Sequence, residues 1–170
     1  LATLIGFDTV SRNSNLPLVE WVEGYLADQG VATRRIPDET GLKASLIATV
    51  GPGHAAGYVL SGHTDVVPVD GQDWSGDPFA ARVSDGRLHG RGACDMKGYL
   101  ASVLAAVPRM TGLARPLHIE FSYDEEVGCT GVRPMLHQMA DWPARPLGCF
   151  VGEPTGMTVV TGHKPSLPKI

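Results

Sequence analysis

Apolar runs of strand length alternate with helical segments along the chain, and this alternation constrains the fold more than any other feature. Apolar residues at helical spacing occupy residues 16–26 and 96–110, and a shorter helix is expected at 131–140. Strands are expected at residues 31–36, 44–50, 57–61, 118–123, 146–151 and 158–161. Such alternation favours an α/β fold, in which a mixed, mostly parallel central sheet is flanked by helices.

Two of the expected strands consist of continuous apolar residues. They are Tyr58-Val59-Leu60 and Cys149-Phe150-Val151. Uninterrupted apolar runs are typical of strands that are covered on both faces. We therefore expect both strands to lie in the middle of the sheet.

Composition narrows the class of protein. The chain has 170 residues, of which 43% are hydrophobic and 19% are charged, and this suits a single soluble domain. A net charge of -4 does not favour a nucleic-acid partner, and no apolar run reaches the roughly 18 residues that span a bilayer. Three cysteines without a short paired spacing favour neither a disulfide framework nor a zinc ribbon, so we expect a cytoplasmic protein without a membrane partner.

Side chains that can bind metal follow the expected strands at the points where these strands end. Three strands each run into a short polar segment, and a fourth polar segment precedes the helix expected at 96–110. These segments carry His63 with Asp65, Glu125 with Glu126, Glu153, and Asp95. In open α/β sheets the ligand crevice lies at the carboxyl ends of the strands, so we expect these side chains to converge there.

Several carboxylates that share a crevice need a positive partner. Without one, each negative charge would raise the pKa of its neighbours until some of them took up protons. A divalent metal resolves this conflict, and one imidazole among several carboxylates suits zinc, cobalt or manganese better than calcium. Asp65 lies two residues after His63, so its carboxylate could accept the free ring N–H and fix the tautomer.

Each candidate also has an ordinary structural explanation. Adjacent acids such as Glu125 and Glu126 are common in the solvated first turn of a helix. Asp95 suits the N-cap of a helix that begins at Met96, and Glu153 precedes a proline in a turn. The set as a whole points to a metal site, whereas the remaining histidines are expected to be structural or solvated; those named are His54, His89, His118 and His137.

Five sequence motifs together resemble those of a known protein family. They are SGHTDVVP, WSGDPF, DGRLHGRGACDMKG, SYDEEVGCTG and GEPTGMTVVTGHK. In this order and spacing they resemble the M20 family of di-zinc metallopeptidases and deacylases, and the likeness covers about residues 1–164. The forms DEEVGC and GRGACDMKG are more similar to the acetylornithine deacetylase branch than to the desuccinylase or carboxypeptidase branches.

The resemblance implies a zinc-peptidase-like catalytic domain with two zinc ions, which cobalt can replace. It implies that His63 and Glu153 bind the first metal, that Asp95 bridges both metals, and that Glu126 binds the second. These assignments come from matching positions in the family motifs.

The resemblance also implies the chemistry. Glu125 would be the general base, and Asp65 would support the metal-binding imidazole. The implied reaction removes the acyl group from a small N-acyl amino acid, with N-acetylornithine giving ornithine and acetate in arginine biosynthesis. Succinyl-diaminopimelate and dipeptides remain alternative substrates.

The family pattern changes near the end of the chain. Family members continue after HKG into a lid domain, which mediates homodimer formation in many of them, whereas this chain reads His163-Lys164-Pro165. We therefore expect residues 1–164 to be the N-terminal part of an incomplete catalytic domain and 165–170 to be a truncated tail where the lid would begin. A last histidine for the second metal would lie further along, so the chain is expected to be inactive alone, either as the metal-bearing part of an amidohydrolase or as a non-catalytic remnant.

Overall fold

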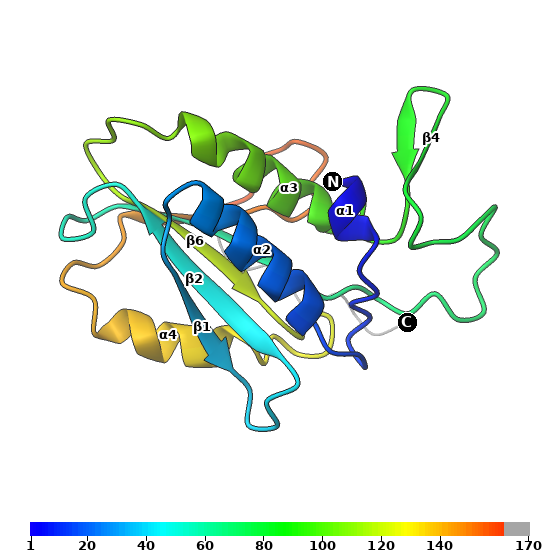
Figure 1. Cartoon of the computed structure of the whole chain (residues 1–170), viewed down its shortest axis with the longest axis horizontal. Coiled ribbons are helices and arrows are strands. Elements are labelled where there is room, and N and C mark those ends of the chain that lie inside the picture. The colour runs from blue at the N-terminus through cyan, green and yellow to red at the C-terminus, as the bar shows by residue number, and fades with distance from the viewer. Residues whose placement is uncertain (162–170) are drawn as a thin grey trace.

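A five-stranded sheet forms the centre of the computed structural model, which describes residues 1–161 (Figure 1). The strands lie in the order β1-β2-β6-β3-β7. Their bounds are β1 Thr33–Pro37, β2 Ala44–Val50, β3 Tyr58–His63, β6 Leu117–Ser122 and β7 Gly148–Val151. β2 pairs antiparallel with β1 and β6, whereas β3 pairs parallel with β6 and β7. Within this sheet β2 runs against the other strands, so the expected mixed, mostly parallel sheet is confirmed.

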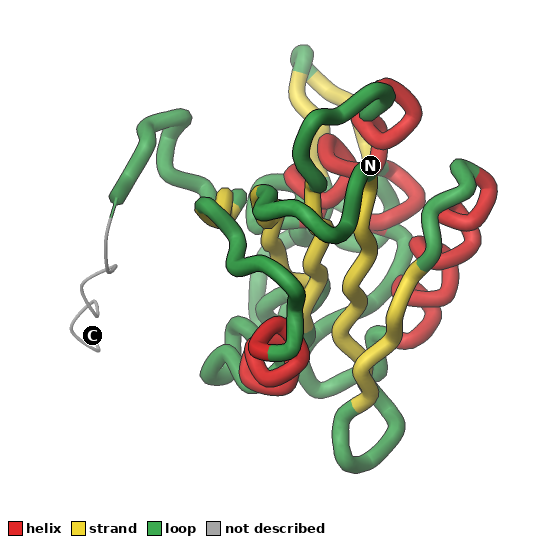
Figure 2. The backbone as a smooth tube through the Cα atoms, turned by 90° about the vertical axis from the view of Figure 1, so that its left-hand side faces the viewer, coloured by secondary structure: helices red, strands yellow, loops and turns green. Residues whose placement is uncertain are grey.

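Helices cover both faces of the sheet (Figure 2). Their bounds are α1 Ala2–Ile5, α2 Leu16–Asp28, α3 Lys97–Ala106, the 3-10 turn η1 Val107–Arg109 and α4 Val132–Ala140. On one face, α2 and α3 pack with α1 over the alternate residues Ile119 and Phe121 of β6. On the opposite face, Met135 of α4 packs against Ile36 and Ile47.

The helices form where apolar spacing and backbone chemistry agree. α2 begins with Pro17 in its first turn, where a missing N–H costs nothing, and it buries a stripe that includes Val22 and Leu26. α3 ends at Ala106, because Pro108 cannot donate a helical hydrogen bond and the chain tightens into η1. The helix expected at 96–110 is therefore split into two elements.

Two expectations about the end of the chain are wrong. Residues 158–161 form no strand, because the chain bends at Gly156 and Met157, which both have positive φ, and Val159 lies exposed with no strand beside it in the described chain. β7 is an edge strand rather than a central one, since it pairs with β3 alone among the described strands. Phe150 is 60% exposed and Val151 is 58% exposed, so β7 is not covered on both faces.

A small hairpin was not predicted. β4 (Arg82–Ser84) pairs antiparallel with β5 (Arg87–His89) and projects away from the central sheet (Figure 1). Asp85 and Gly86 form its turn with φ angles of 51° and 69°. Asp-Gly is the pair that such two-residue turns favour, so the sequence did contain the signal.

Two expectations, about the C-terminal tail and about a membrane-spanning segment, concern different parts of the chain. The expected tail at 165–170 and the segment His163-Lys164-Pro165 lie outside the described residues. None of the helices within residues 1–161 has the combination of length and hydropathy that a membrane-spanning segment requires.

Candidate metal centre

The topology brings the four polar segments to one edge of the sheet. β3 and β6 are parallel neighbours, and their last residues, His63 and Ser122, lie side by side in register. The turn after β6 carries Glu125 and Glu126, and the segment after β7 carries Glu153. The expected convergence at the carboxyl ends of parallel strands therefore has its basis in the strand order.

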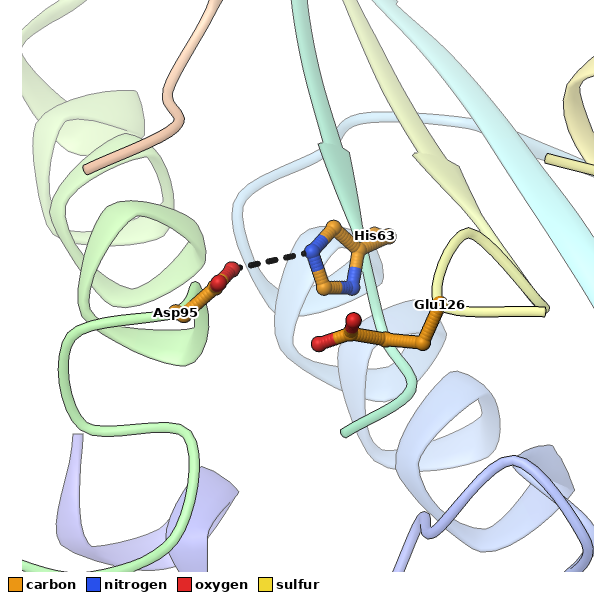
Figure 3. A group of neighbouring side chains, drawn as sticks. All are labelled: His63, Asp95 and Glu126. Atoms are coloured by element: carbon orange, nitrogen blue, oxygen red, sulfur yellow. Dashed lines mark hydrogen bonds and ion pairs between the residues drawn. The ribbon is translucent and has the colours of Figure 1, made fainter. Parts of the chain in front are cut away.

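The imidazole of His63 is the centre of the cluster. Its Nε2 lies 3.1 Å from Asp95 Oδ1, 3.9 Å from Glu153 Oε1 and 4.0 Å from Glu125 Oε2. Asp95 reaches it from the loop just before α3, and Glu126 approaches from the turn after β6 (Figure 3).

Two overlapping groups of donor atoms result. One atom each from His63, Asp95 and Glu126 lie within 4.8 Å of one another, and the same holds for His63, Glu125 and Glu153. The five metal-capable residues that the sequence singled out thus meet in one place. In the second group Glu153 lies close to Glu125. The family motif implies that Glu125 is the general base rather than a metal ligand.

Asp65 contacts the His63 ring at Nδ1, the nitrogen that does not face the other carboxylates. His63 Nδ1 lies 2.9 Å from the backbone carbonyl of Asp65 and 3.3 Å from its Oδ1. Both partners are acceptors, so Nδ1 carries the N–H that faces them, and in the neutral ring the lone pair of Nε2 then faces the carboxylates. The carboxylate was expected as the partner of the ring, but the backbone carbonyl is the closer acceptor.

The same carboxylate also fixes the turn after β6. The backbone N–H of Glu125 donates to Asp65 Oδ1 at 3.0 Å, and that of Glu126 donates to Oδ2 at 3.2 Å. Asp65 thus ties the imidazole to the turn that carries both glutamates. Despite burial, which would raise it, the pKa of Asp65 is lowered by its bonds to His63, to Ser11 and to the Glu125 N–H.

Negatively charged carboxylates surround the imidazole ring of His63. Burial by itself would lower the pKa of His63, but the Asp65 carboxylate and the charges of Glu153 and Glu125 raise it to about 9. Burial, reinforced by the negative charge of Asp95, raises the pKa of Glu126 to about 6. One imidazole nitrogen facing carboxylate oxygens from three segments is a donor set that fits a divalent cation, and such a cation would relieve this repulsion.

The ordinary structural explanations of three site residues do not hold. Glu125 and Glu126 lie in a turn that ends before α4 begins at Val132, so they are not a first helical turn. Met96 occupies the N-cap position of α3, and no side chain caps that helix, so Asp95 is not its cap.

A cavity opens beside the ring. It has a volume of about 190 Å³, and its lining includes His63, Glu125, Cys129 and Glu153. Cys129 Sγ lies 3.6 Å from Glu125 Oε1. The cavity gives a small molecule access to the carboxylate implied as the base.

Two residues next to the site were missed from the sequence. Lys97 is fully buried, and its Nζ donates to the Phe7 carbonyl at 2.7 Å. Burial lowers the pKa of this amine to about 8. A lysine within an apolar helix was a usable signal for a buried partner. The second residue, Ser11, donates to Asp65, and no sequence pattern marks it.

Comparison with known proteins identifies the family. Residues 59–165 match the family described as Peptidase family M20/M25/M40. The chain belongs to this family. Its members are hydrolases, and the M20 metallopeptidases among them act with divalent metal.

Curated relatives from bacteria cover nearly the whole chain. It is 37% identical to the acetylornithine deacetylase of Pasteurella multocida (strain Pm70) in an alignment of 165 positions that covers 95% of this chain and 42% of that protein. It is 36% identical to the acetylornithine deacetylase of Edwardsiella ictaluri (strain 93-146), with 95% and 43% covered. The chain thus spans less than half the length of these relatives.

Solved structures agree on the fold. The M20 family metallo-carboxypeptidase Sso-CP2 from Sulfolobus solfataricus superposes with a TM-score of 0.77 at 18% identity, over 89% of this chain and 36% of that one. Human carnosine dipeptidase 1 gives a TM-score of 0.70 at 21% identity, over 82% of this chain and 34% of that one. At such identities the likeness concerns the fold.

Proposed function

We propose that this chain is the metal-bearing part of a zinc-dependent amidohydrolase that removes the acyl group from an N-acyl amino acid. The observation that carries the proposal is the convergence of His63, Asp95, Glu125, Glu126 and Glu153 at the carboxyl ends of parallel strands. Membership of a hydrolase family supports the reaction class.

Four side chains of the site are the proposed metal ligands. His63, Asp95, Glu126 and Glu153 would hold two metal ions, with Asp95 shared between them. A bound divalent ion would polarise the amide carbonyl and lower the pKa of a water molecule.

Glu125 would act as the general base of the reaction. Its Oε2 lies 4.0 Å from His63 Nε2, and the residue lines the cavity beside the ring. From there its carboxylate would accept a proton from the attacking water and return it to the nitrogen of the leaving amine. Asp65 would hold Glu125 at this distance through the backbone N–H that it accepts.

N-acetylornithine is the proposed substrate, with acetate and ornithine as products in arginine biosynthesis. The named activity of the bacterial relatives supports this choice. The three cysteines are all unpaired, which supports a reducing, cytoplasmic compartment. We also propose that the 170-residue chain alone turns over slowly, because His63 supplies the single imidazole of the site within residues 1–161.

Adjacent glutamates with different tasks provide the test. Glu126→Gln is expected to lower the zinc content of the chain, because a neutral amide is a poorer ligand for a dication. Glu125→Gln is expected to keep zinc and to lower kcat by roughly 10²- to 10⁴-fold, because an amide cannot accept a proton. Zinc is measured by elemental analysis of the chain, and kcat in a chimera that joins this chain to the remaining length of the Pasteurella multocida relative.

The chimera also decides the substrate. N-acetylornithine, N-succinyl-diaminopimelate and a dipeptide are compared by release of the free amine, and the first is expected to have the highest kcat/KM. Zinc loss in Glu125→Gln with retention in Glu126→Gln would mean that the two roles are exchanged. Normal zinc content and normal kcat in both variants would refute the proposed site.

A further inference from the structure

The segment between α1 and α2 runs past the back of the candidate metal centre. We call residues 9–15 the N-terminal strap. Its backbone forms a parallel bridge with the chain just after β3, in which Ser11 N–H donates to the Val66 carbonyl at 3.2 Å and Val66 N–H donates to the Thr9 carbonyl at 3.0 Å. The strap is therefore anchored beside Asp65 by main-chain bonds that need no side chain.

One strap side chain reaches into the site. The Ser11 hydroxyl donates to Asp65 Oδ2 at 2.7 Å, which is the shortest of the hydrogen bonds that this carboxylate accepts. Both groups are buried, with Asp65 2% and Ser11 7% exposed. A charged acceptor out of reach of water depends on its few donors, and a hydroxyl bonded to a carboxylate is among the stronger ones.

The bond lies at a point where three parts of the site meet. Asp65 Oδ1 faces His63 Nδ1 at 3.3 Å and accepts the Glu125 N–H, while Oδ2 accepts the Glu126 N–H and the Ser11 hydroxyl. If the hydroxyl is removed, Oδ2 retains the Glu126 N–H, and the carboxylate can rotate away from the position that serves both the ring and the turn.

We infer that Ser11 is a positioning residue of the metal centre, which acts through Asp65 to orient the imidazole of His63 and the turn of Glu125 and Glu126. The inference rests on the proposed function, because it takes this cluster to be a metal site. Partners behind metal ligands commonly change metal affinity by roughly 10- to 100-fold when they are removed. Ser11 stands one step further out, so we expect a loss of about tenfold.

The test measures zinc affinity and amide exchange on the whole chain. Zinc binding to Ser11→Ala is followed by competition with a chromogenic chelator, and about tenfold weaker binding is expected. Amide hydrogen exchange is followed by NMR without metal, and faster exchange is expected at Glu125 and Glu126. Ser11→Thr keeps the hydroxyl and is expected to restore both values.

Thr9→Val is the matched control. The Thr9 hydroxyl is also a buried donor of the strap, but it bonds to the Thr64 carbonyl at 2.6 Å and to no carboxylate of the site. Zinc affinity close to that of the wild type is expected for this variant. If Ser11→Ala does not fold, Ser11→Cys decides, because a thiol has nearly the same shape and is a weaker donor, so an intermediate loss is expected.

The outcomes separate this inference from the proposed function. Wild-type zinc affinity and unchanged exchange in Ser11→Ala would overturn the role of Ser11 and leave the metal centre standing. Equal losses in Thr9→Val and Ser11→Ala would also overturn it, since the effect would then be general loosening of the strap. If the wild-type chain bound no zinc, the metal centre would fail, whereas faster exchange at Glu125 and Glu126 in Ser11→Ala would still support the positioning of the turn by Ser11.

Discussion

Glu120 is a buried carboxyl group in the middle of β6, away from the metal centre. Its side chain is 3% exposed and lies on the α4 face of the sheet, level with Ile47 and Ser61 on the neighbouring strands. Its Oε1 has no hydrogen-bond partner within the described part of the chain. Burial raises the pKa of Glu120 from 4.5 to about 7, so the folded protein prefers this side chain protonated.

Replacement of Glu120 is expected to change how the free energy of unfolding depends on pH. Because the folded state holds the proton more tightly than the unfolded state does, the contribution of Glu120 to stability is fully present below about pH 4.5 and is lost as the pH rises through about 7. The free energy of unfolding of Glu120→Gln relative to wild type should therefore increase between about pH 5 and about pH 8, by up to about 3 kcal/mol. Urea unfolding at each pH measures it.

An exposed glutamate serves as the control for this prediction. Glu39→Gln removes a carboxylate that is exposed at the surface near β1, so it accounts for the general effect of removing one negative charge. A difference for Glu120→Gln that did not change with pH would show that its carboxyl group reaches water or finds a partner in solution.

The residues that sequence reasoning found and those it missed differ in a physical respect. His63, Glu125 and Glu153 could be found because each lies at the end of an apolar strand or within three residues after it, and strand ends meet at one edge of the sheet. Ser11 could not be found, because the chain that carries it reaches Asp65 through tertiary packing. Glu120 was also not singled out, since the alternation of side chains along a strand does not show which face of the sheet is covered by a helix.

The N-terminus of α4 lies in direct backbone contact with the end of β6. Gly131 N–H donates to the Tyr123 carbonyl at 3.1 Å, and the Gly131 carbonyl accepts the Ser45 hydroxyl at 2.9 Å. A Cβ at Gly131 would lie 2.3 Å from the Tyr123 oxygen and 2.7 Å from its nitrogen. This contact closes the turn that carries Glu125 and Glu126, so the absence of a side chain at Gly131 is part of the site's support.

Two glycine substitutions are therefore expected to act in opposite directions. Gly131→Ala should destabilise the fold by at least about 1–3 kcal/mol, because the added methyl group meets backbone atoms that cannot rotate away. Gly24→Ala should stabilise it by about 0.5–1 kcal/mol, since Gly24 lies within α2 with open space around its Cα. Urea midpoints followed by circular dichroism measure both, and a neutral Gly131→Ala would mean that α4 can shift away from β6.

Prediction of the elements succeeded where the apolar period was clear. α2 and the strands β1, β2, β3 and β6 lie within a few residues of their expected positions. The errors at the end of the chain are of two kinds: the apolar run of β7 was interpreted as buried, and residues 158–161 were predicted to form a strand. Apolar content makes a strand compatible with burial, but whether a strand becomes central or an edge depends on the chain segments that lie beside it.

The two edges of the sheet differ in how they are protected. β1 ends one side with Arg34, Arg35 and Pro37, residues that discourage pairing with another chain. β7 ends the other side with the uncharged sequence Gly-Cys-Phe-Val, and Phe150 and Val151 are more than half exposed. Unpaired backbone next to exposed apolar side chains is a template for association between chains.

We therefore expect the 170-residue chain to self-associate through β7 as its concentration rises. Phe150→Lys should reduce the association, because a charge beside the unpaired backbone must be desolvated when a second strand pairs there. Leu42→Lys is the matched control, since Leu42 is also an exposed apolar residue but lies in the β1–β2 connection. Sedimentation velocity over a range of concentrations measures the association. A wild-type chain that stays monomeric throughout, or equal effects of the two lysines, would show that β7 does not drive it.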